Sequence, residues 1–348
     1  MTAGDGDRGL VASPRRQMLD LLEAYRIVPL LGAFAELGVA DALLDGPASV
    51  DDLARAVGAH PQALSRALRA LAPYGCFTRT DDGRIGLTPM AELLLSDRSG
   101  SLRPAAMYHA AEWHWRPYGH VLHSLRTGET GFRAAHGSGL FEYLASSPDD
   151  AALFNDAMSA EAPLRAASLS RSYDFREIET IVDVAGGHGS ITLALLARHK
   201  HLNGVVFDLP EVVAGAHAVI DAAGLSERCQ AVGGSMMREV PAGGDAYLVA
   251  WILHNWGDDD AIRILRNCRE AMAPEGKVLV LEMVIPPGGD HFPGKALDLE
   301  MLVIAGGLER TEEEYRALFD EAGLVLNRVV PLLAMPMSLL EGTPKPTA

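Results

Sequence analysis

The sequence predicts an α/β protein in which a mostly helical first domain precedes a doubly wound one. Two observations carry this prediction. From residue 181 onward, short apolar runs typical of strands alternate with helical runs, an order that gives a mainly parallel sheet covered by helices. In the first hundred residues, two short helical runs precede a hairpin-like pair of strands. We expect domains at residues 1–100 and 174–348, joined by a helical, pocket-forming region at 101–173.

Composition and charge exclude several classes of protein. The chain has 348 residues, 48% of them hydrophobic, and a net charge of −16, which argues against a nucleic-acid or anionic-membrane partner. It contains no apolar run near the roughly 20 residues that span a bilayer, and it does not open with a secretion signal. The three cysteines are widely spaced, without metal-ligand or redox pairing. We therefore expect a cytoplasmic protein that binds neither membrane nor nucleic acid.

The first helical stretch is unusually apolar. Large apolar residues recur at helical spacing from Gln17 to Leu44, and Pro29 should bend or interrupt that helix. So apolar a face indicates that this stretch is buried, either against a partner subunit or against the rest of the chain.

A winged-helix pattern follows. Ser49 caps the start of a helix, Gly58 marks a turn, Pro61 opens a second helix, and the turn at residues 81–83 joins two short strands. Such a unit can bind DNA or serve as a scaffold for dimerisation. Arginines at positions 66 and 69 favour DNA, but four aspartates surround the same module. We prefer the dimerisation scaffold and keep a DNA-binding regulator as the alternative from another functional class.

Aromatic and histidine residues crowd the region after residue 101. A helix with such side chains on several faces belongs to a core or to the wall of a pocket for a flat ligand. Acidic residues at metal-ligand spacing are missing, so we expect no metal. The candidates for contacts with a substrate are Tyr108, His109, Trp113, Phe154 and Met158.

A glycine turn is the strongest local signal. The apolar run 181–184, which includes Asp183, leads into Gly186, Gly187 and Gly189, and a helix follows at 191–197. A strand, a glycine turn and a helix N-terminus together form a unit that can grip a cofactor, because glycine lets a ligand approach the backbone closely.

Asp208 ends the next strand, about 20 residues later, where a carboxylate is placed to accept hydrogen bonds from a ribose diol. The glycine spacing lacks the full pattern of a pyrophosphate binder. It favours a nucleoside without phosphates, of which S-adenosylmethionine (SAM) is the commonest, although a purely structural turn is the alternative.

The remaining elements complete the doubly wound order. We expect helices at 212–223, 259–272 and 312–322, and strands at 229–233, 246–253, 277–284, 324–331 and 337–340. Ligands of such domains bind at the carboxyl ends of the strands. Candidate site residues at those ends are Asp208, Ser235, Met236, His254, Asn255, Trp256, Glu282 and Glu309.

Four segments together resemble one family. They are VDVAGGHG at 182–189, FDLPEV at 207–212, GGDAYLVAWILHNWGDDDAIRIL at 243–265 and GGLERTEEEY at 306–315. The chain resembles, over nearly its whole length, the class I SAM-dependent O-methyltransferases of the caffeic acid and hydroxyindole type, including bacterial relatives that methylate aromatic polyketides. The resemblance implies a Rossmann-like SAM-binding domain and a homodimer formed through the first domain. It also implies metal-free methyl transfer to an aromatic hydroxyl in natural-product or antibiotic biosynthesis, with S-adenosylhomocysteine as the product.

The resemblance assigns catalytic roles to three residues. His254 resembles the general base, Glu309 the carboxylate that orients its imidazole, and Glu282 the acid on its other side. A base that removes the phenol proton as the oxygen attacks contributes about 10²–10⁴-fold to the rate. Without the resemblance, His254 could simply cap the following helix, with both glutamates in unrelated surface pairs.

The resemblance also implies a cofactor site. Its residues are Asp183, Gly186, Asp208, Leu209, Ser235, Met236, Ala250 and Arg165. Gly186 would pass under the methionine moiety, and Arg165 resembles an arginine that reaches the SAM carboxylate. Ser235 replaces the usual acid for the adenine amine, and Ala250 stands where plant members often have lysine. Asn255 replaces an aspartate and resembles an acceptor contact of bacterial members.

These departures leave two alternatives open within the family. The chain could act by proximity alone, with His254 only orienting the acceptor. It could also bind SAM while catalysing another step, such as hydroxylation or decarboxylation of a polyketide.

Overall fold

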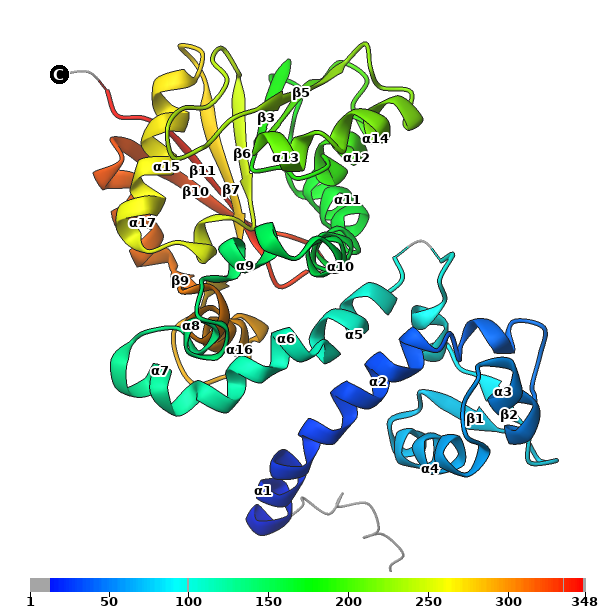
Figure 1. The fold of residues 1–348 in the computed structure, drawn as a ribbon. Coiled ribbons are helices and arrows are strands. Elements are labelled where there is room, and N and C mark those ends of the chain that lie inside the picture. The colour runs from blue at the N-terminus through cyan, green and yellow to red at the C-terminus, as the bar shows by residue number, and fades with distance from the viewer. Residues whose placement is uncertain (1–12, 99, 334, 347–348) are drawn as a thin grey trace, which may run out of the picture. The chain divides into compact units, whose positions relative to one another are not determined.

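A computed structural model describes residues 13–98, 100–333 and 335–346 (Figure 1). Contacts between residues divide the chain into two units, one ending at Trp115 and one beginning at Arg116. Each unit has its own apolar core. None of the helices in the described residues combines the length and the apolarity that crossing a bilayer requires.

The first unit begins with two helices where the sequence predicts one. They are α1 (Pro14–Glu23) and α2 (Ile27–Glu36), separated by a short 3₁₀ turn at Ala24–Arg26. The interruption comes just before Pro29, because a proline ring clashes with the carbonyl four residues earlier. Pro29 itself lies in the first turn of α2, where a missing N–H costs nothing. The helix ends at Glu36, well short of Leu44.

The predicted winged helix is confirmed. It consists of α3 (Val50–Ala56), α4 (Pro61–Leu71) and the antiparallel strands β1 (Phe77–Arg79) and β2 (Ile85–Leu87). The Ser49 hydroxyl accepts the backbone N–H of Asp52 at 3.1 Å, which caps α3.

Two further helices, α5 (Arg103–Ala110) and α6 (Glu112–Trp115), complete the first unit. Helix α5 packs very closely on α2. A Cβ added to Gly32 would lie 2.1 Å from that of Ala110, so this contact requires glycine at position 32.

The second unit begins with helices and continues as an α/β domain. Its leading helices are α7 (Val121–Thr127), α8 (Gly131–His136), α9 (Leu140–Ser146), α10 (Pro148–Ser159) and α11 (Ala162–Ser172). The strands of the large sheet are β3 (Thr180–Val184), β4 (Asn203–Asp208), β5 (Cys229–Gly233), β6 (Ala246–Ala250), β7 (Lys277–Glu282), β10 (Leu324–Pro331) and β11 (Ser338–Pro344). The connecting helices are α12 (Ser190–Arg198), α13 (Pro210–Val213), α14 (Ala216–Ala222), α15 (Asp258–Ala271), α16 (Pro293–Glu300) and α17 (Glu312–Glu321).

The seven strands lie in the order β10-β11-β7-β6-β3-β4-β5. Strands β3 to β7 are parallel to one another, and β11 runs antiparallel to both β7 and β10. From β3 the chain adds β4 and then β5 toward one edge of the sheet. It then returns to β6 on the other side of β3 and adds β7 toward the opposite edge. The switch point of the sheet therefore lies between β3 and β6, and ligands of such sheets bind beyond the strand ends at that point.

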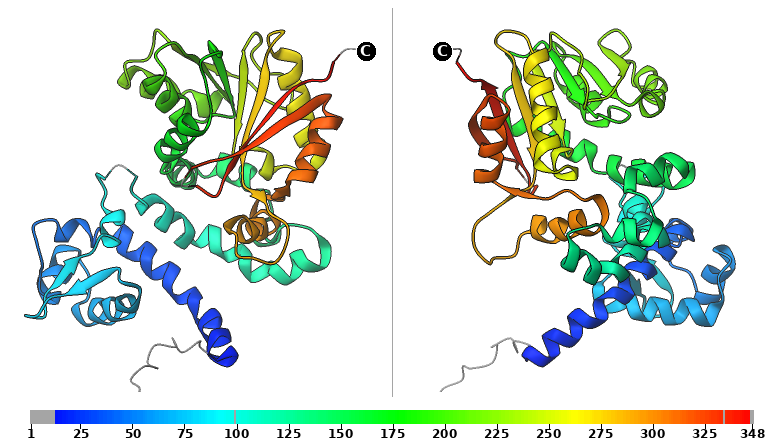
Figure 2. Two further views of the ribbon diagram at one scale, coloured as in Figure 1. Left: turned by 180° about the vertical axis from the view of Figure 1, so that it is seen from behind. Right: turned by 60° about the vertical axis from the view of Figure 1, so that its left-hand side comes forward.

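Helices cover both faces of this sheet (Figure 2). Alternate strand residues face opposite ways, so Ile181 joins a core with α11, α12 and α14, while Val182 joins another with α15 and α17. The predicted doubly wound, Rossmann-like fold is confirmed.

Three further predicted elements are divided or end earlier than expected. The strand expected to reach residue 253 ends at Ala250, because Trp251 turns the chain with a φ of 59°. The helix expected at 212–223 is divided into α13 and α14. The strand expected at 277–284 ends at Glu282, and residues 284–285 form β8 (Val284–Ile285), which pairs with β9 (Arg310–Thr311).

Candidate active site

The turn after β3 has the conformation that its glycines permit. Gly187 and Gly189 have φ angles of 59° and 80°, a region that side chains disfavour. A Cβ on Gly186 would lie 2.6 Å from the Asp183 carboxyl carbon, and one on Gly189 would lie 2.6 Å from a Val206 methyl group. This turn is therefore packed tightly against the protein beneath it. At Gly187, by contrast, a Cβ would meet no atom of the described residues within 4 Å.

Asp208 joins the end of β4 to this turn. Its two carboxylate oxygens accept the backbone N–H groups of Gly187 at 2.8 Å and Leu209 at 2.7 Å. Burial raises the pKa of Asp208, although the two backbone donors oppose that shift. A carboxylate oxygen has more than one lone pair, so both can still accept hydrogen bonds from a ribose diol. The residues present thus fit the nucleoside that the sequence predicts.

Asp183 lies beneath the turn. Its side chain is 3% exposed and accepts the Thr192 hydroxyl at 2.7 Å, which ties β3 to α12. Burial raises the pKa of Asp183 to about 7. The carboxyl group packs against the turn at Gly186. Its predicted contact with a cofactor stays a prediction.

The other predicted cofactor residues follow the neighbouring strands. Ser235 and Met236 come after β5, and the Met236 carbonyl accepts the Asn267 side-chain amide at 2.7 Å. Ala250 is the last residue of β6. All three lie near strand ends on the carboxyl side of the sheet, as the sequence predicts.

His254 lies in a 3₁₀ turn (Leu253–Asn255) between β6 and α15 and is 5% exposed. Its Nδ1 lies 2.6 Å from Oε1 of Glu309 and 3.7 Å from Oε2 of Glu282. The other Glu282 oxygen accepts the backbone N–H groups of Ile252 at 3.0 Å and His254 at 3.4 Å. The structure thus brings together the three residues that the resemblance assigns to catalysis.

This cluster sets the charge of the imidazole. Burial opposes protonation, but the charge of Glu282 and the hydrogen bond and charge of Glu309 outweigh it, so the pKa of His254 is raised. Burial also raises the pKa of Glu282 to about 7. Because a carboxylate accepts at Nδ1, the neutral imidazole carries its proton there and leaves Nε2 as a proton acceptor. The arrangement can therefore act as a base.

Trp251 is a residue that sequence reasoning missed. With Ala185, it is one of two non-glycine residues with positive φ in the described part of the chain, and both immediately follow a central strand. A bulky residue in this conformation costs on the order of 1–2 kcal/mol. Its ring lies 5.6 Å from the His254 ring. Nothing in the local sequence signals this conformation, which tertiary contacts impose.

Arg165 stacks on that tryptophan. Its guanidinium carbon lies 3.7 Å from the centre of the Trp251 ring, and one nitrogen lies 3.2 Å from the Glu161 carboxylate. Burial lowers the pKa of Arg165 to about 10, which leaves it charged near pH 7. The structure therefore places Arg165 beside the His254 turn, through Trp251.

The predicted substrate residues are divided between the units. Tyr108, His109 and Trp113 lie in the first unit, where the rings of His109 and Trp113 pack against that of Tyr108. Asn255, Phe154 and Met158 lie in the second, and the Asn255 amide donates to the Trp251 carbonyl at 3.4 Å. Contacts of these six residues with a substrate stay predictions.

An aromatic group in the second unit joins two residues that the sequence singles out, Phe154 and Trp256, to Phe141. The Phe141 ring stacks on that of Trp256 with centres 6.0 Å apart and planes 11° apart. It also meets the edge of Phe154 at 6.5 Å. Trp256 comes two residues after His254, so these rings lie next to the turn that carries it. Of the three, only Phe141 was not predicted as a site residue.

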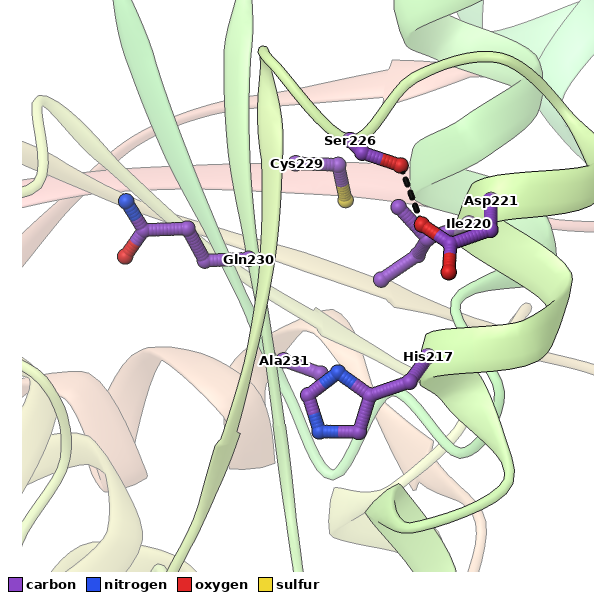
Figure 3. A pocket seen from close by; sticks show the side chains of 7 residues that line it. All are labelled: His217, Ile220, Asp221, Ser226, Cys229, Gln230 and Ala231. Atoms are coloured by element: carbon purple, nitrogen blue, oxygen red, sulfur yellow. Dashed lines mark hydrogen bonds between the residues drawn. The ribbon is translucent and has the colours of Figure 1, made fainter.

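A cavity of about 330 Å³ lies elsewhere in this unit (Figure 3). It is lined by His217, Ile220, Asp221, Ser226, Cys229, Gln230 and Ala231. These residues belong to α14, the turn after it and the first residues of β5. The cavity is therefore at the amino end of β5, away from the strand ends that carry Asp208 and His254.

Two family models match the chain. Residues 118–325 match the O-methyltransferase domain, and residues 19–97 match the O-methyltransferase dimerisation domain. The second match favours the dimerisation scaffold over the DNA-binding alternative for the winged helix.

Two individual O-methyltransferases are similar to the chain over nearly its whole length. The chain is 40% identical to the phenazine O-methyltransferase PhzM of Lysobacter antibioticus, over 94% of this chain and 95% of that protein. It superposes on the mitomycin 7-O-methyltransferase MmcR with a TM-score of 0.87 and 34% identity, over 95% of this chain and 97% of the other.

A third match was solved with ligands. It is an O-methyltransferase from neocarzinostatin biosynthesis in complex with SAM and 2-hydroxy-5-methyl naphthoic acid, with a TM-score of 0.76 and 35% identity over 91% of this chain and 96% of that one. The predicted family is confirmed: the chain belongs to the SAM-dependent O-methyltransferases.

Proposed function

We propose that this chain transfers a methyl group from SAM to a hydroxyl of an aromatic natural-product acceptor, with His254 as the general base. The observation that carries the proposal is the 2.6 Å contact between His254 Nδ1 and the Glu309 carboxylate. That contact leaves Nε2 as the acceptor for the phenolic proton.

His254 and its neighbours perform the acid–base part of the reaction. A neutral phenol is a weak nucleophile, and a positioned base increases its reactivity as the oxygen attacks. When the imidazole takes the proton, Glu309 stabilises the resulting cation through its hydrogen bond, and Glu282 contributes a second charge 3.7 Å from Nδ1. Asn255 would hold the acceptor in line.

The turn after β3 and Asp208 would hold the methyl donor. SAM supplies an electrophilic methyl group on a sulfonium centre. Asp208 would accept the ribose hydroxyls, and Gly186 and Gly187 would let the ligand approach the backbone. Arg165 keeps its charge at the carboxyl side of the sheet and would attract a carboxylate. Alignment of the oxygen and the methyl group supplies most of the remaining rate.

The acceptor that suits the second unit is a fused aromatic. Phe141, Phe154 and Trp256 present rings beside the His254 turn, and flat polycyclic ligands pack on such surfaces. The relatives named above act on or bind phenazine, mitomycin and naphthoic compounds. We therefore favour a hydroxylated fused-ring acceptor over a simple phenol.

A transfer assay tests this function. The purified protein is incubated with methyl-labelled SAM and a panel of hydroxynaphthoates, hydroxyphenazines, anthracyclines and simple phenols, with and without EDTA. We expect label on a fused-ring hydroxyl and an unchanged rate in EDTA, although the His254, Glu282 and Glu309 side chains lie close enough together to hold a cation. If no hydroxyl in the panel accepts the label, or if EDTA abolishes transfer, the proposal is wrong.

We further propose that the enzyme works in the cytoplasm as a homodimer assembled through its first unit. Helix α1 has no buried residue, and Met18, Leu21, Leu22 and Tyr25 are all more than half exposed. A second copy of the chain would cover this face, since burying apolar area contributes roughly 25 cal/mol per Å². Light scattering at micromolar concentration should give the dimer mass, and a monomer would contradict the proposal. All three cysteines are free and buried, which suits a reducing compartment.

A further inference from the structure

Arg310 is a fully buried arginine next to Glu309 in the chain. Its guanidinium donates to the Leu253 carbonyl at 3.1 Å and to the Trp256 carbonyl at 2.8 Å. These two carbonyls flank His254 and Asn255. The third partner is the carboxylate of Asp258, the first residue of α15, at 2.8–3.0 Å. A single side chain therefore holds both ends of the turn that carries the proposed base.

The same segment also holds the middle of that turn. The Leu308 N–H donates to the His254 carbonyl at 2.9 Å. Gly307 lies so close that an added Cβ would be 1.9 Å from the same carbonyl oxygen. Residues 307–310 thus contact the backbone of the turn at three carbonyls, while Glu309 holds the imidazole.

We propose that Arg310 is a positioning residue for His254, and that Gly307 is required so that residues 307–310 can lie against the turn. This inference rests on the proposed function, because it takes His254 as the base whose position matters. We call residues 307–310 the clamp.

Stability alone does not account for a buried arginine at this place. Its ion-pair partner, Asp258, is 65% exposed, so solvent screens the pair from the carboxylate side. A well-packed apolar residue is often as stabilising as a buried charge. What an arginine adds is a rigid planar fork that reaches several acceptors in fixed directions.

The clamp couples two sets of contacts with His254. Arg310 contacts the backbone of the turn that carries it, and Glu309 accepts a hydrogen bond from its imidazole. Because Glu309 precedes Arg310, the contacts of Arg310 with the turn also fix the starting point of the Glu309 side chain. A displacement of about 1 Å in a catalytic group can lower the rate by about 10²-fold. Loss of the fork should therefore lower kcat through the Nδ1–Glu309 hydrogen bond, without an effect on the cofactor site after β3.

The first test replaces Arg310 by lysine, which keeps the charge but not the fork. We expect Arg310→Lys to lower kcat by about tenfold or more, with SAM Kd within twofold of the parent. Proton NMR of protein with ¹⁵N-labelled histidine should show a low-field Nδ1–H signal in the parent, because a 2.6 Å hydrogen bond to a carboxylate is short and strong. His254→Ala assigns that signal, and Arg310→Lys should shift or broaden it.

A glycine pair provides the matched control. Gly307→Ala should lower kcat and disturb the same signal, because its methyl group must displace the His254 carbonyl. Gly289→Ala should leave both at parent values, because a Cβ there meets no atom of the described residues within 4 Å and its φ is ordinary. Melting temperatures identify any variant that fails to fold. If Arg310→Lys does not fold, Gly307→Ala decides the question.

The inference is overturned if folded Arg310→Lys or Gly307→Ala keeps kcat within twofold and the low-field signal unchanged. Its failure can be distinguished from failure of the proposed function. If His254→Ala retains activity, His254 is not the base, whatever the clamp variants do. If His254→Ala is inactive and the clamp variants resemble the parent, only the clamp is wrong.

Discussion

The turns after β3 and after β6 lie on either side of the switch point of the sheet, but they are built differently. The turn after β3 is largely local: its glycines allow its conformation, and its main long-range contact is Asp208, about 20 residues later. The turn after β6 is held by distant segments, since Glu282 and Glu309 reach His254 from 28 and 55 residues away.

The difference shows how each half of the reaction is encoded. Cofactor binding depends on backbone that must be approached closely, so glycine marks it in the sequence. The base is a side chain that needs a carboxylate at Nδ1 to fix the position of its proton. The carboxylates come from segments that are distant in sequence and that the fold brings together. Changes near β6 should therefore affect kcat, and changes near β3 should affect SAM affinity.

The largest effect is expected after β6. His254→Ala should lower kcat by about 10²-fold or more and leave SAM affinity within twofold, because the imidazole acts on the acceptor proton. Steady-state kinetics and calorimetry measure the two quantities. A parallel loss of SAM affinity would mean that the two turns are not independent.

The next effect is expected after β3. Gly189→Ala should weaken SAM binding at least tenfold, because alanine is strained at a φ of 80° and its Cβ would lie 2.6 Å from a Val206 methyl group. Calorimetry with SAM measures this effect. Gly128→Ala, also at positive φ but with no atom of the described residues within 4 Å of its Cβ, controls for backbone strain alone. Equal losses in the two variants would argue against a role of the β3 turn.

Glu309→Gln should lower kcat by about tenfold, less than loss of the base itself. Glutamine can still orient Nδ1 through its side-chain oxygen, but it cannot stabilise the imidazolium by charge. Steady-state kinetics at saturating SAM measure this loss in kcat. A loss as large as that of His254→Ala would indicate that Glu309 takes part in proton transfer directly.

The smallest effect is expected for Asp208→Asn. Asparagine keeps one acceptor oxygen for a ribose hydroxyl, but its NH2 group would face one of the backbone N–H groups of Gly187 and Leu209, and neutral hydrogen bonds are roughly half as strong as charge-assisted ones. SAM Kd should rise a few-fold while kcat at saturating SAM stays close to the parent value. An unchanged Kd would mean that Asp208 only holds the Gly187 turn and does not contact the ribose.

The same contrast explains what could be predicted from the sequence. The alternating strands, the winged helix and the glycine turn follow from local patterns, and each is present. The clustering of His254 with Glu282 and Glu309 came from the family resemblance, since no spacing in the chain brings positions 254 and 309 together. Trp251 and Arg310 were missed, because a positive φ on tryptophan and a buried guanidinium depend on tertiary contacts that leave no local pattern.

The most direct test of the central claim is the dependence of kcat on pH in the parent and in His254→Ala. The base acts when neutral, so the rate should rise with pH as His254 loses its proton. Because Glu282 and Glu309 raise the pKa of His254, the midpoint should lie above the ordinary value of 6.5. We expect this inflection in the parent and its absence from His254→Ala. An inflection that persists in the variant, together with a loss in kcat of less than about tenfold, would show that His254 only positions the acceptor and that alignment carries the catalysis.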